Sequence, residues 1–324
     1  MRTIRLAGLL TLSVISASVP GVALAQQAPP PAASADARRE TALPNLPGSG
    51  PYPAIMETDT SLPDHVIYRP SDLAKLGSRK LGVVLWGNGG CSADGASARQ
   101  HLLEIASHGY VVITPGRILS GPSATEKPAP RSPGTPPGQL PPVATTSADV
   151  RAGLDWALAR NSDKAGRYAG RIDPTMIAAS GHSCGGLQAL ELAPDTRIHA
   201  LIINNSGVFA DGSNPIQGIS VNKAMLKRIH TPVIYILGGP ADIAYPNGTD
   251  DFTKIDHVPA ALVNIPVGHG GTFGKPYGGV VAQGVVDWLE WQLRGDTTAG
   301  RSFTGPACRL CVAPGLTIAR KKID

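Results

Sequence analysis

A serine lies between two glycines in the pentapeptide GHSCG at residues 181–185. A Gly-x-Ser-x-Gly pattern is typical of a nucleophilic serine on a sharp strand-to-helix turn, where close packing of the two elements admits only small residues beside it. The pattern alone is weak, but an apolar run at 176–180 precedes it and a helix-like segment at 184–193 follows it. In this context the sequence predicts that Ser183 is a nucleophile rather than part of a plain glycine-rich turn.

A nucleophilic serine needs a general base, and the base needs a carboxylate that orients it. His269 follows the last apolar run of strand length, so we expect it to be the base. Asp242 follows the preceding run and is the expected acid, whereas Asp250 and Asp251 are alternatives that we expect to cap the next helix. The side chain of His182 is expected to point away from the site, and the other six histidines are assigned no role. The chain order serine, aspartate, histidine is that of the α/β-hydrolases.

Two backbone N–H groups are expected to bind the oxyanion that forms when a serine attacks a carbonyl. One belongs to Cys184, which follows the serine at the start of the expected helix. The other belongs to the glycine-rich turn at 87–91, where we expect Asn88 to donate. Gly89 is the alternative donor and is expected to contribute to the substrate-binding surface.

Apolar runs of strand length alternate with segments of helical period along most of the chain. The inner runs are apolar throughout, which is typical of a parallel sheet covered by helices on both faces. We therefore expect an α/β fold, specifically the α/β-hydrolase fold with a mostly parallel central sheet, in one domain over 51–324. The expected strands span 65–69, 81–86, 110–114, 176–180, 200–205, 232–237 and 261–266, and the expected helices 95–107, 147–160, 184–193, 221–229 and 280–294.

The first 25 residues have the pattern of a secretory signal peptide, with two arginines, an apolar core and a small-residue cleavage site. Residues 26–50 are rich in proline and alanine and are expected to form a disordered linker. No later segment is apolar over a length that would span a bilayer. These features predict a secreted or periplasmic protein without a membrane span.

The chain has 29 Lys and Arg against 24 Asp and Glu, a formal net charge of +5. The basic residues are scattered rather than gathered in runs with interleaved aromatics, so a nucleic-acid partner is not expected. No metal-ligand cluster, nucleotide-binding loop or cofactor motif stands out in the sequence, and we expect neither a metal nor a cofactor.

Four cysteines in an exported chain indicate disulfides. Cys308 and Cys311 lie three residues apart in the tail at 297–324, and we expect a local disulfide there rather than half of a zinc site. Cys91 and Cys184 are either free thiols or a second bridge that would join the two segments expected to bind the oxyanion.

A proline-rich insertion at about 120–146 cannot form a helix interior. It follows the expected strand at 110–114 and should therefore emerge at the carboxyl edge of the sheet, where open α/β sheets bind ligands. It is expected to form either part of the substrate rim or a surface insertion.

The motifs LWGNGG, EIASHGYVVITPGR, GHSCGG, LGGPADIAYP and GHGGTF occur in an order that resembles bacterial cutinases and poly(ethylene terephthalate) hydrolases, within the wider dienelactone-hydrolase-like group. The resemblance covers most of residues 51–296. In that family an aromatic residue after the oxyanion turn and a tryptophan after the strand that follows the serine clamp an aromatic acyl group. The resemblance places Asn88 and Phe209 at these positions, which implies a substrate-binding role for Phe209, and Cys184 where methionine is usual.

Together these features predict a serine hydrolase that cleaves small or polymeric carboxylic esters through an acyl-enzyme. A peptidase, amidase or lactone hydrolase with the same triad is the alternative among enzymes. A non-catalytic binding protein on the same scaffold is the alternative from another class, because a fold alone does not establish a function.

Overall fold

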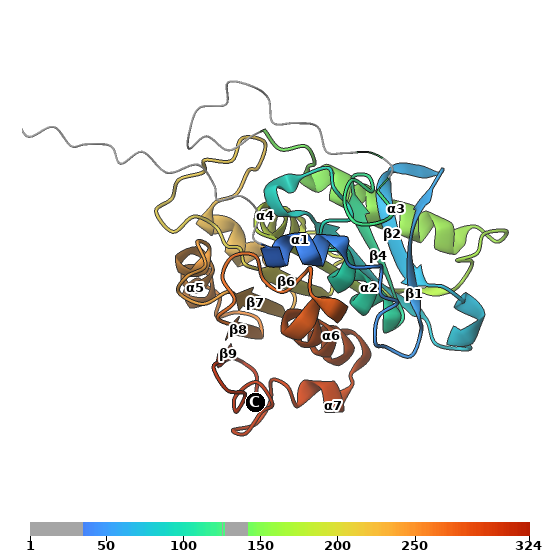
Figure 1. Cartoon of the computed structure of the whole chain (residues 1–324). Coiled ribbons are helices and arrows are strands. Elements are labelled where there is room, and N and C mark those ends of the chain that lie inside the picture. Colours follow the sequence, from blue (N-terminus) through green and yellow to red (C-terminus); the bar gives the residue numbers. More distant parts are fainter. Residues whose placement is uncertain (1–34, 125, 127–141) are drawn as a thin grey trace, which may run out of the picture.

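A computed structural model describes residues 35–124, 126 and 142–324, which form a nine-stranded mixed sheet with helices on both faces (Figure 1). The strand order is β1-β2-β4-β3-β5-β6-β7-β8-β9, and the strands from β4 to β8 in this order run parallel. The strands are β1 (Ala54–Asp59), β2 (Leu62–Pro70), β3 (Leu81–Gly87), β4 (Tyr110–Pro115), β5 (Ile172–His182), β6 (Ala200–Asn204), β7 (Val233–Leu237), β8 (Ala260–Asn264) and β9 (Thr317–Lys321). The predicted α/β class with a mostly parallel sheet is confirmed.

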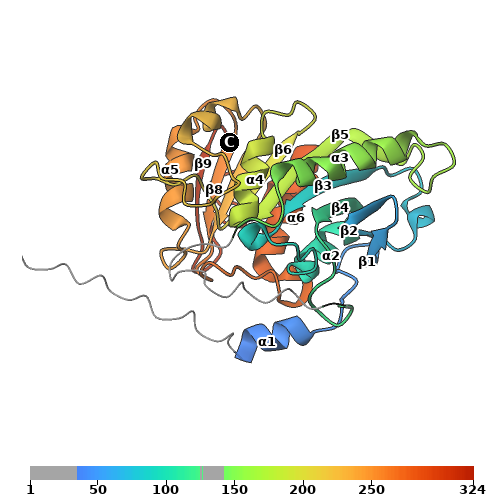
Figure 2. The same ribbon diagram turned by 90° about the horizontal axis from the view of Figure 1, so that it is seen from above.

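The helices form two layers around the sheet, with α3, α4 and α5 on one face and α2 and α6 on the other (Figure 2). The α-helices are α1 (Ala35–Ala42), α2 (Arg99–Ser107), α3 (Ser147–Ser162), α4 (Cys184–Leu192), α5 (Tyr245–Lys254), α6 (Gly279–Arg294) and α7 (Thr297–Gly300). Short 3-10 turns are η1 (Leu73–Leu76), η2 (Gly89–Cys91), η3 (Lys223–Arg228) and η4 (Pro276–Gly278).

Strand β3 shows how the apolar runs build two cores at once. Val83 and Leu85 belong to the core under α3 and α4, while Val84 and Trp86 belong to the core under α2 and α6. Successive side chains of a strand point to opposite faces, so a strand covered on both sides must be apolar at every position. All four side chains are buried.

The two edges of the sheet contain strands that the apolar pattern does not predict. β1 pairs antiparallel with β2, and β9 pairs antiparallel with β8. The tail at 297–324 thus contains the short helix α7 at its start and the edge strand β9 near its end. Helix α5 is also absent from the expected elements, and the expected helix at 221–229 is the 3-10 turn η3.

The structure differs from the expected linker at 26–50. Residues 35–42 form α1, and Ser49 donates hydrogen bonds from its backbone N–H and its hydroxyl to the buried carboxylate of Glu104 in α2, at 2.7 and 2.6 Å. The expected signal peptide lies outside the described residues, as do residues 26–34.

Most of the proline-rich insertion also lies outside the described residues. Its last residues are tied to the turn after β3, because the N–H groups of Ala144 and Thr145 both donate to the Cys91 carbonyl, at 2.9 and 3.0 Å. Thr146 then forms a reciprocal capping box with Asp149 at the start of α3.

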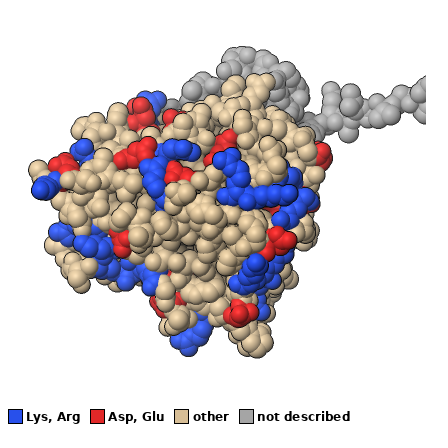
Figure 3. All heavy atoms as spheres, turned by 180° about the vertical axis from the view of Figure 1, so that it is seen from behind, with Lys and Arg blue, Asp and Glu red and all other residues tan. Residues whose placement is uncertain are grey.

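Basic and acidic side chains are interspersed over the face seen in Figure 3, as expected from the scattered charges of the sequence. Within the described ranges, no helix combines the length and the apolar character needed to cross a membrane.

Candidate active site

Ser183 occupies a strained turn between β5 and α4, with φ 53° and ψ −122°. Positive φ is unfavourable for a residue with a side chain, and such strain persists where the surrounding packing imposes it. That packing is tight, because a Cβ on Gly181 would lie 2.2 Å from the Gly185 carbonyl oxygen. A Cβ on Gly185 would lie 2.0 Å from the Gly87 carbonyl oxygen. The glycines of the pentapeptide are therefore required by the close approach of β5, α4 and the end of β3.

The three residues expected to form a triad are joined by hydrogen bonds. His269 Nε2 lies 3.0 Å from Ser183 Oγ, and His269 Nδ1 lies 2.6 Å from Asp242 Oδ1. Ser183 follows β5, Asp242 follows β7 and His269 follows β8, so all three lie at the carboxyl edge of the sheet. The arrangement has the geometry in which a histidine can accept a serine proton while a carboxylate orients the ring.

The Asp242 carboxylate is buried but well satisfied. Its two oxygens accept hydrogen bonds from the backbone N–H groups of Gly238 and Ala244 and from the side chain of Asn205, in addition to His269. Burial alone would raise the pKa of Asp242, but these hydrogen bonds outweigh it and lower the pKa to about 2. The group is therefore an anion at neutral pH.

Asn205 is a site residue that the sequence analysis does not identify. Its amide nitrogen lies 2.8 Å from Asp242 Oδ2 and 3.1 Å from the carbonyl oxygen of Gly268, the residue before His269. Asn205 has φ 45°, a conformation that asparagine tolerates better than most residues. The sequence signal for this residue was the pair Asn204 and Asn205 at the end of the β6 run. The carboxyl end of β6 lies between those of β5 and β7, the strands that precede Ser183 and Asp242.

The two expected oxyanion donors lie on segments that touch each other. Cys184 is the first residue of α4, where a backbone N–H has no partner within the helix. The backbone nitrogen of Asn88 would lie 2.7 Å from a Cβ on Gly185, one residue further along α4. The Asn88 side chain is buried and structural: it donates to the carbonyls of Ser92 and Pro115 and accepts from the Thr114 hydroxyl. These contacts fix the turn that carries the Asn88 N–H.

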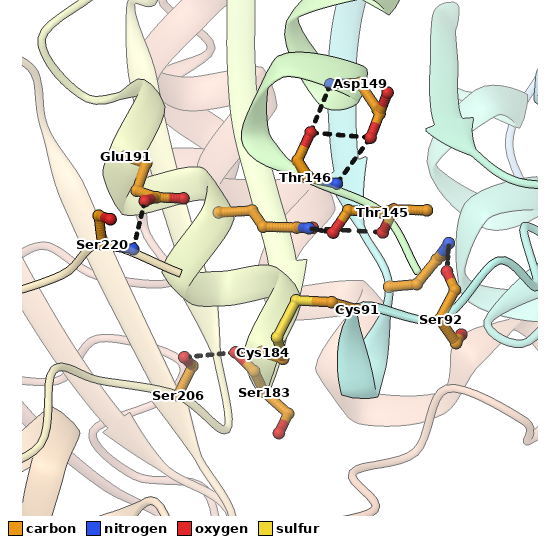
Figure 4. Close-up of a disulfide and its surroundings, with 12 residues drawn as sticks. Cys91, Ser92, Thr145, Thr146, Asp149, Ser183, Cys184, Glu191, Ser206 and Ser220 are labelled. Atoms are coloured by element: carbon orange, nitrogen blue, oxygen red, sulfur yellow. Dashed lines mark hydrogen bonds between the residues drawn. A yellow bond between two sulfur atoms is a disulfide. The ribbon is translucent and has the colours of Figure 1, made fainter. Parts of the chain in front are cut away.

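A disulfide joins these segments, since Cys91 is bonded to Cys184 (Figure 4). Both residues are buried, and the second disulfide joins Cys308 to Cys311. Of the two possibilities left open for Cys91 and Cys184, the bridge is the one present.

His182 does not point away from the site, so this expectation is wrong. Its Nε2 donates to the His269 carbonyl oxygen at 2.8 Å, and its ring lies 5.3 Å from the His269 ring and 4.7 Å from that of Phe273. Burial lowers the pKa of His182 to about 4, although the hydrogen bond to the His269 carbonyl opposes the shift. The ring is therefore neutral at neutral pH and holds the backbone of His269 in place.

A cavity of about 150 Å³ opens beside Ser183 and His269. Its wall is mostly apolar and includes Phe209, the residue expected to contribute to substrate binding. Leu187, Ile216 and Ile243 add aliphatic surface. The cavity can accept a small apolar group attached to a carbonyl at Ser183.

Asp250 and Asp251 do not cap a helix; both lie in the last half of α5. Each forms an ion pair with Lys223, at 2.6 and 2.7 Å. Asp251 also accepts from the Val208 backbone N–H and from the Tyr235 hydroxyl, at 2.8 and 3.2 Å. Neither aspartate is hydrogen-bonded to His269, so Asp242 is the acid that the geometry favours.

In residues 35–124, 126 and 142–324, no group of three or more His, Cys, Asp or Glu side chains is arranged to hold a metal ion. Comparison of the chain with models of known protein families and with curated proteins finds no match. The function proposed for this chain therefore rests on the geometry of its site.

Proposed function

We propose that this chain is an exported serine hydrolase of the α/β-hydrolase fold that cleaves carboxylic esters. The observation that carries the proposal is the continuous hydrogen-bonded chain from Ser183 through His269 to Asp242, at a strained strand-to-helix turn. The two disulfides support export, because such bonds persist in oxidising compartments.

In the proposed reaction, Ser183 Oγ attacks the ester carbonyl carbon while His269 Nε2 takes the hydroxyl proton. The N–H groups of Cys184 and Asn88 stabilise the negative charge that develops on the carbonyl oxygen. The tetrahedral intermediate then expels the alcohol, which receives the proton from His269, and an acyl-enzyme remains. His269 next takes a proton from water, the resulting hydroxyl attacks the acyl carbon, and the carboxylic acid leaves as Ser183 recovers its proton.

Asp242 is proposed to orient His269 and to stabilise the imidazolium that forms in each half of the reaction. The apolar cavity lined by Phe209 is proposed to hold the acyl group. This assignment favours short or flat acyl groups, because the cavity is only about 150 Å³. A cutinase-like activity on polyesters is one form that this function could take.

Rapid mixing with p-nitrophenyl butyrate tests the proposal. The wild-type chain should release a burst of about one p-nitrophenol per active site, followed by slower steady turnover, because acylation by this activated ester is faster than deacylation. Ser183→Ala should show no burst, and its kcat should fall by about 10³-fold or more. A variant that keeps the burst would contradict the proposal. Hydrolysis of the matching butyryl p-nitroanilide at a comparable rate would instead favour an amidase.

A further inference from the structure

A second, larger cavity of about 380 Å³ lies next to the candidate site. It is lined by Gly89, His182 and Gly270, which directly adjoin Asn88, Ser183 and His269 in the sequence. The smaller cavity is lined by Ser183, Cys184 and His269 themselves. The larger cavity is therefore lined by the sequence neighbours of the residues proposed to carry the reaction, and the smaller one by three of those residues' own segments.

The walls of the larger cavity differ in chemistry from those of the smaller one. Trp86 and Phe273 form an aromatic surface, with ring centroids 5.7 Å apart. Glu40, Ser97 and Arg99 bring polar groups to the lining. A carboxylate accepts hydrogen bonds from hydroxyl groups, and a serine hydroxyl both donates and accepts. The lining therefore suits a molecule with an apolar face and hydroxyl groups.

Glu40 and Thr41, near the end of helix α1, line this cavity, and Arg99 holds that end of the helix in place. Arg99 Nη2 donates to the carbonyl oxygens of Glu40, Thr41 and Leu43, at 3.2, 2.9 and 2.7 Å. The guanidinium is thus engaged with the backbone at the end of α1 rather than presented to a ligand anion. This engagement favours an uncharged occupant over a carboxylate or phosphate.

Glu40 also reaches the segment that carries His269. A Cβ on Gly274 would lie 2.7 Å from Glu40 Oε2, so Gly274 leaves the space in which this carboxylate lies. Gly270, Phe273 and Gly274 all line the cavity and all belong to the segment that begins at His269. The segment that follows His269 therefore forms part of the wall of this cavity.

We propose that the larger cavity binds the alcohol half of the ester, and that this alcohol is uncharged and carries at least one further hydroxyl group. The inference rests on the proposed ester hydrolysis. The acyl and alcohol parts of an ester extend from the carbonyl carbon in different directions, and His269 returns its proton to the alcohol oxygen. The apolar cavity then receives the acyl group, and the polar-edged cavity under α1 receives the alcohol.

Two butyrate esters with the same acyl group test this assignment: the monobutyrate ester of glycerol and propyl butyrate. In the wild-type chain, kcat/KM for the glycerol ester should be about 10 times that for the propyl ester. The propyl group has no hydroxyl to pair with the polar groups of the cavity, and leaving such a group unpaired costs roughly that factor or more. Glu40→Ala and Ser97→Ala should lower the ratio toward one. Phe209→Ala, in the apolar cavity, should change both rates and leave the ratio unchanged.

Deacylation provides the control for general damage, because the butyryl-enzyme no longer contains the alcohol. Ala98→Leu, which places a larger side chain on the cavity wall, should lower kcat/KM for the glycerol ester while the hydrolysis rate of a preformed butyryl-enzyme stays unchanged. A wild-type ratio near one, or variants at Glu40 and Ser97 that leave the ratio unchanged, would overturn the alcohol-site assignment. Failure to form a butyryl-enzyme at all would instead contradict the proposed function.

Discussion

Four hydrogen bonds converge on the Asp242 carboxylate, from His269, Gly238, Ala244 and Asn205. They explain how a buried carboxyl group can keep a pKa of about 2 and remain charged beside the proposed base. The two neighbouring aspartates in α5 have different surroundings, which allows the role of Asp242 to be separated from that of a nearby negative charge.

Asp242→Asn should lower kcat by about 10³-fold or more, because an amide cannot stabilise the imidazolium or hold the same tautomer of His269. Asp250→Asn is the matched control, since Asp250 pairs with Lys223 and Lys254 and is not bonded to His269. Its kcat on p-nitrophenyl butyrate should stay within about twofold of wild type. The reverse pattern would transfer the acid role to Asp250.

Asp251 should make the free energy of unfolding depend on pH. Burial raises the pKa of this carboxyl to about 6 despite its bonds to Lys223, Val208 and Tyr235. The native state therefore keeps the proton after the unfolded chain has lost it. The associated stability is fully present below about pH 4 and is lost as the pH rises through about 6, a change on the order of 2 kcal/mol.

Urea unfolding of wild type and Asp251→Asn between pH 4 and 7 measures this effect. The stability of the wild type should decrease with pH relative to the variant and level off above about pH 6. Asp250→Asn should keep the decrease of stability with pH, because Asp251 remains buried in that variant. Parallel curves for wild type and Asp251→Asn would contradict the assignment.

At the scale of elements, the site depends on how closely α4 approaches the ends of β3 and β5. Gly185→Ala should destabilise the chain by about 3 kcal/mol, because the added methyl group has no space to enter. It should also lower kcat, since the methyl pushes the turn at Asn88 away from α4. Gly284→Ala in α6 is the control: its nearest contact would be 3.8 Å, and alanine favours a helix by about 1 kcal/mol.

Thermal unfolding and esterase assays of both glycine variants decide this point. A Gly185→Ala chain as stable and active as Gly284→Ala would show that the close approach is not required. Gly186 is not a suitable substitute, because a Cβ there would meet the Ser206 side chain instead of the turn after β3.

The elements that position the candidate site were predictable, because each inner strand is a continuous apolar run followed by a turn. Edge strands lack this signal: β9 is exposed or half-buried along its length, and its sequence resembles a surface loop. Helix α5 contains a proline and a glycine, which weaken its helical pattern. The orientation of His182 was not predictable, since it follows from its hydrogen bond to the His269 carbonyl and its packing against Phe273.

At the scale of the whole molecule, the Cys91–Cys184 disulfide links positions 93 residues apart and closes a loop that contains α2, β4, α3 and β5. The Cys308–Cys311 disulfide spans three residues and lies in the tail. Chain-entropy reasoning gives the long loop about 4 to 5 kcal/mol of stabilisation and the short loop about 2 kcal/mol.

Replacing Cys91 and Cys184 together by alanine should therefore cost more stability than replacing Cys308 and Cys311 together. It should also lower kcat by about tenfold, because the two segments that carry the proposed oxyanion donors are no longer linked. The tail variant should keep its kcat. Equal losses of kcat in both double variants would indicate that the long bridge has no specific role at the site.

Covalent labelling tests most directly whether Ser183 is a nucleophile activated by His269. Incubation of the folded protein with a fluorophosphonate, followed by peptide mass spectrometry, should find one adduct per chain, on Ser183. Ser183→Ala should remain unlabelled, and His269→Ala should label at least about 10²-fold more slowly, because the hydroxyl then lacks its base. A folded wild-type protein that does not label, or that labels at another serine, would contradict the account.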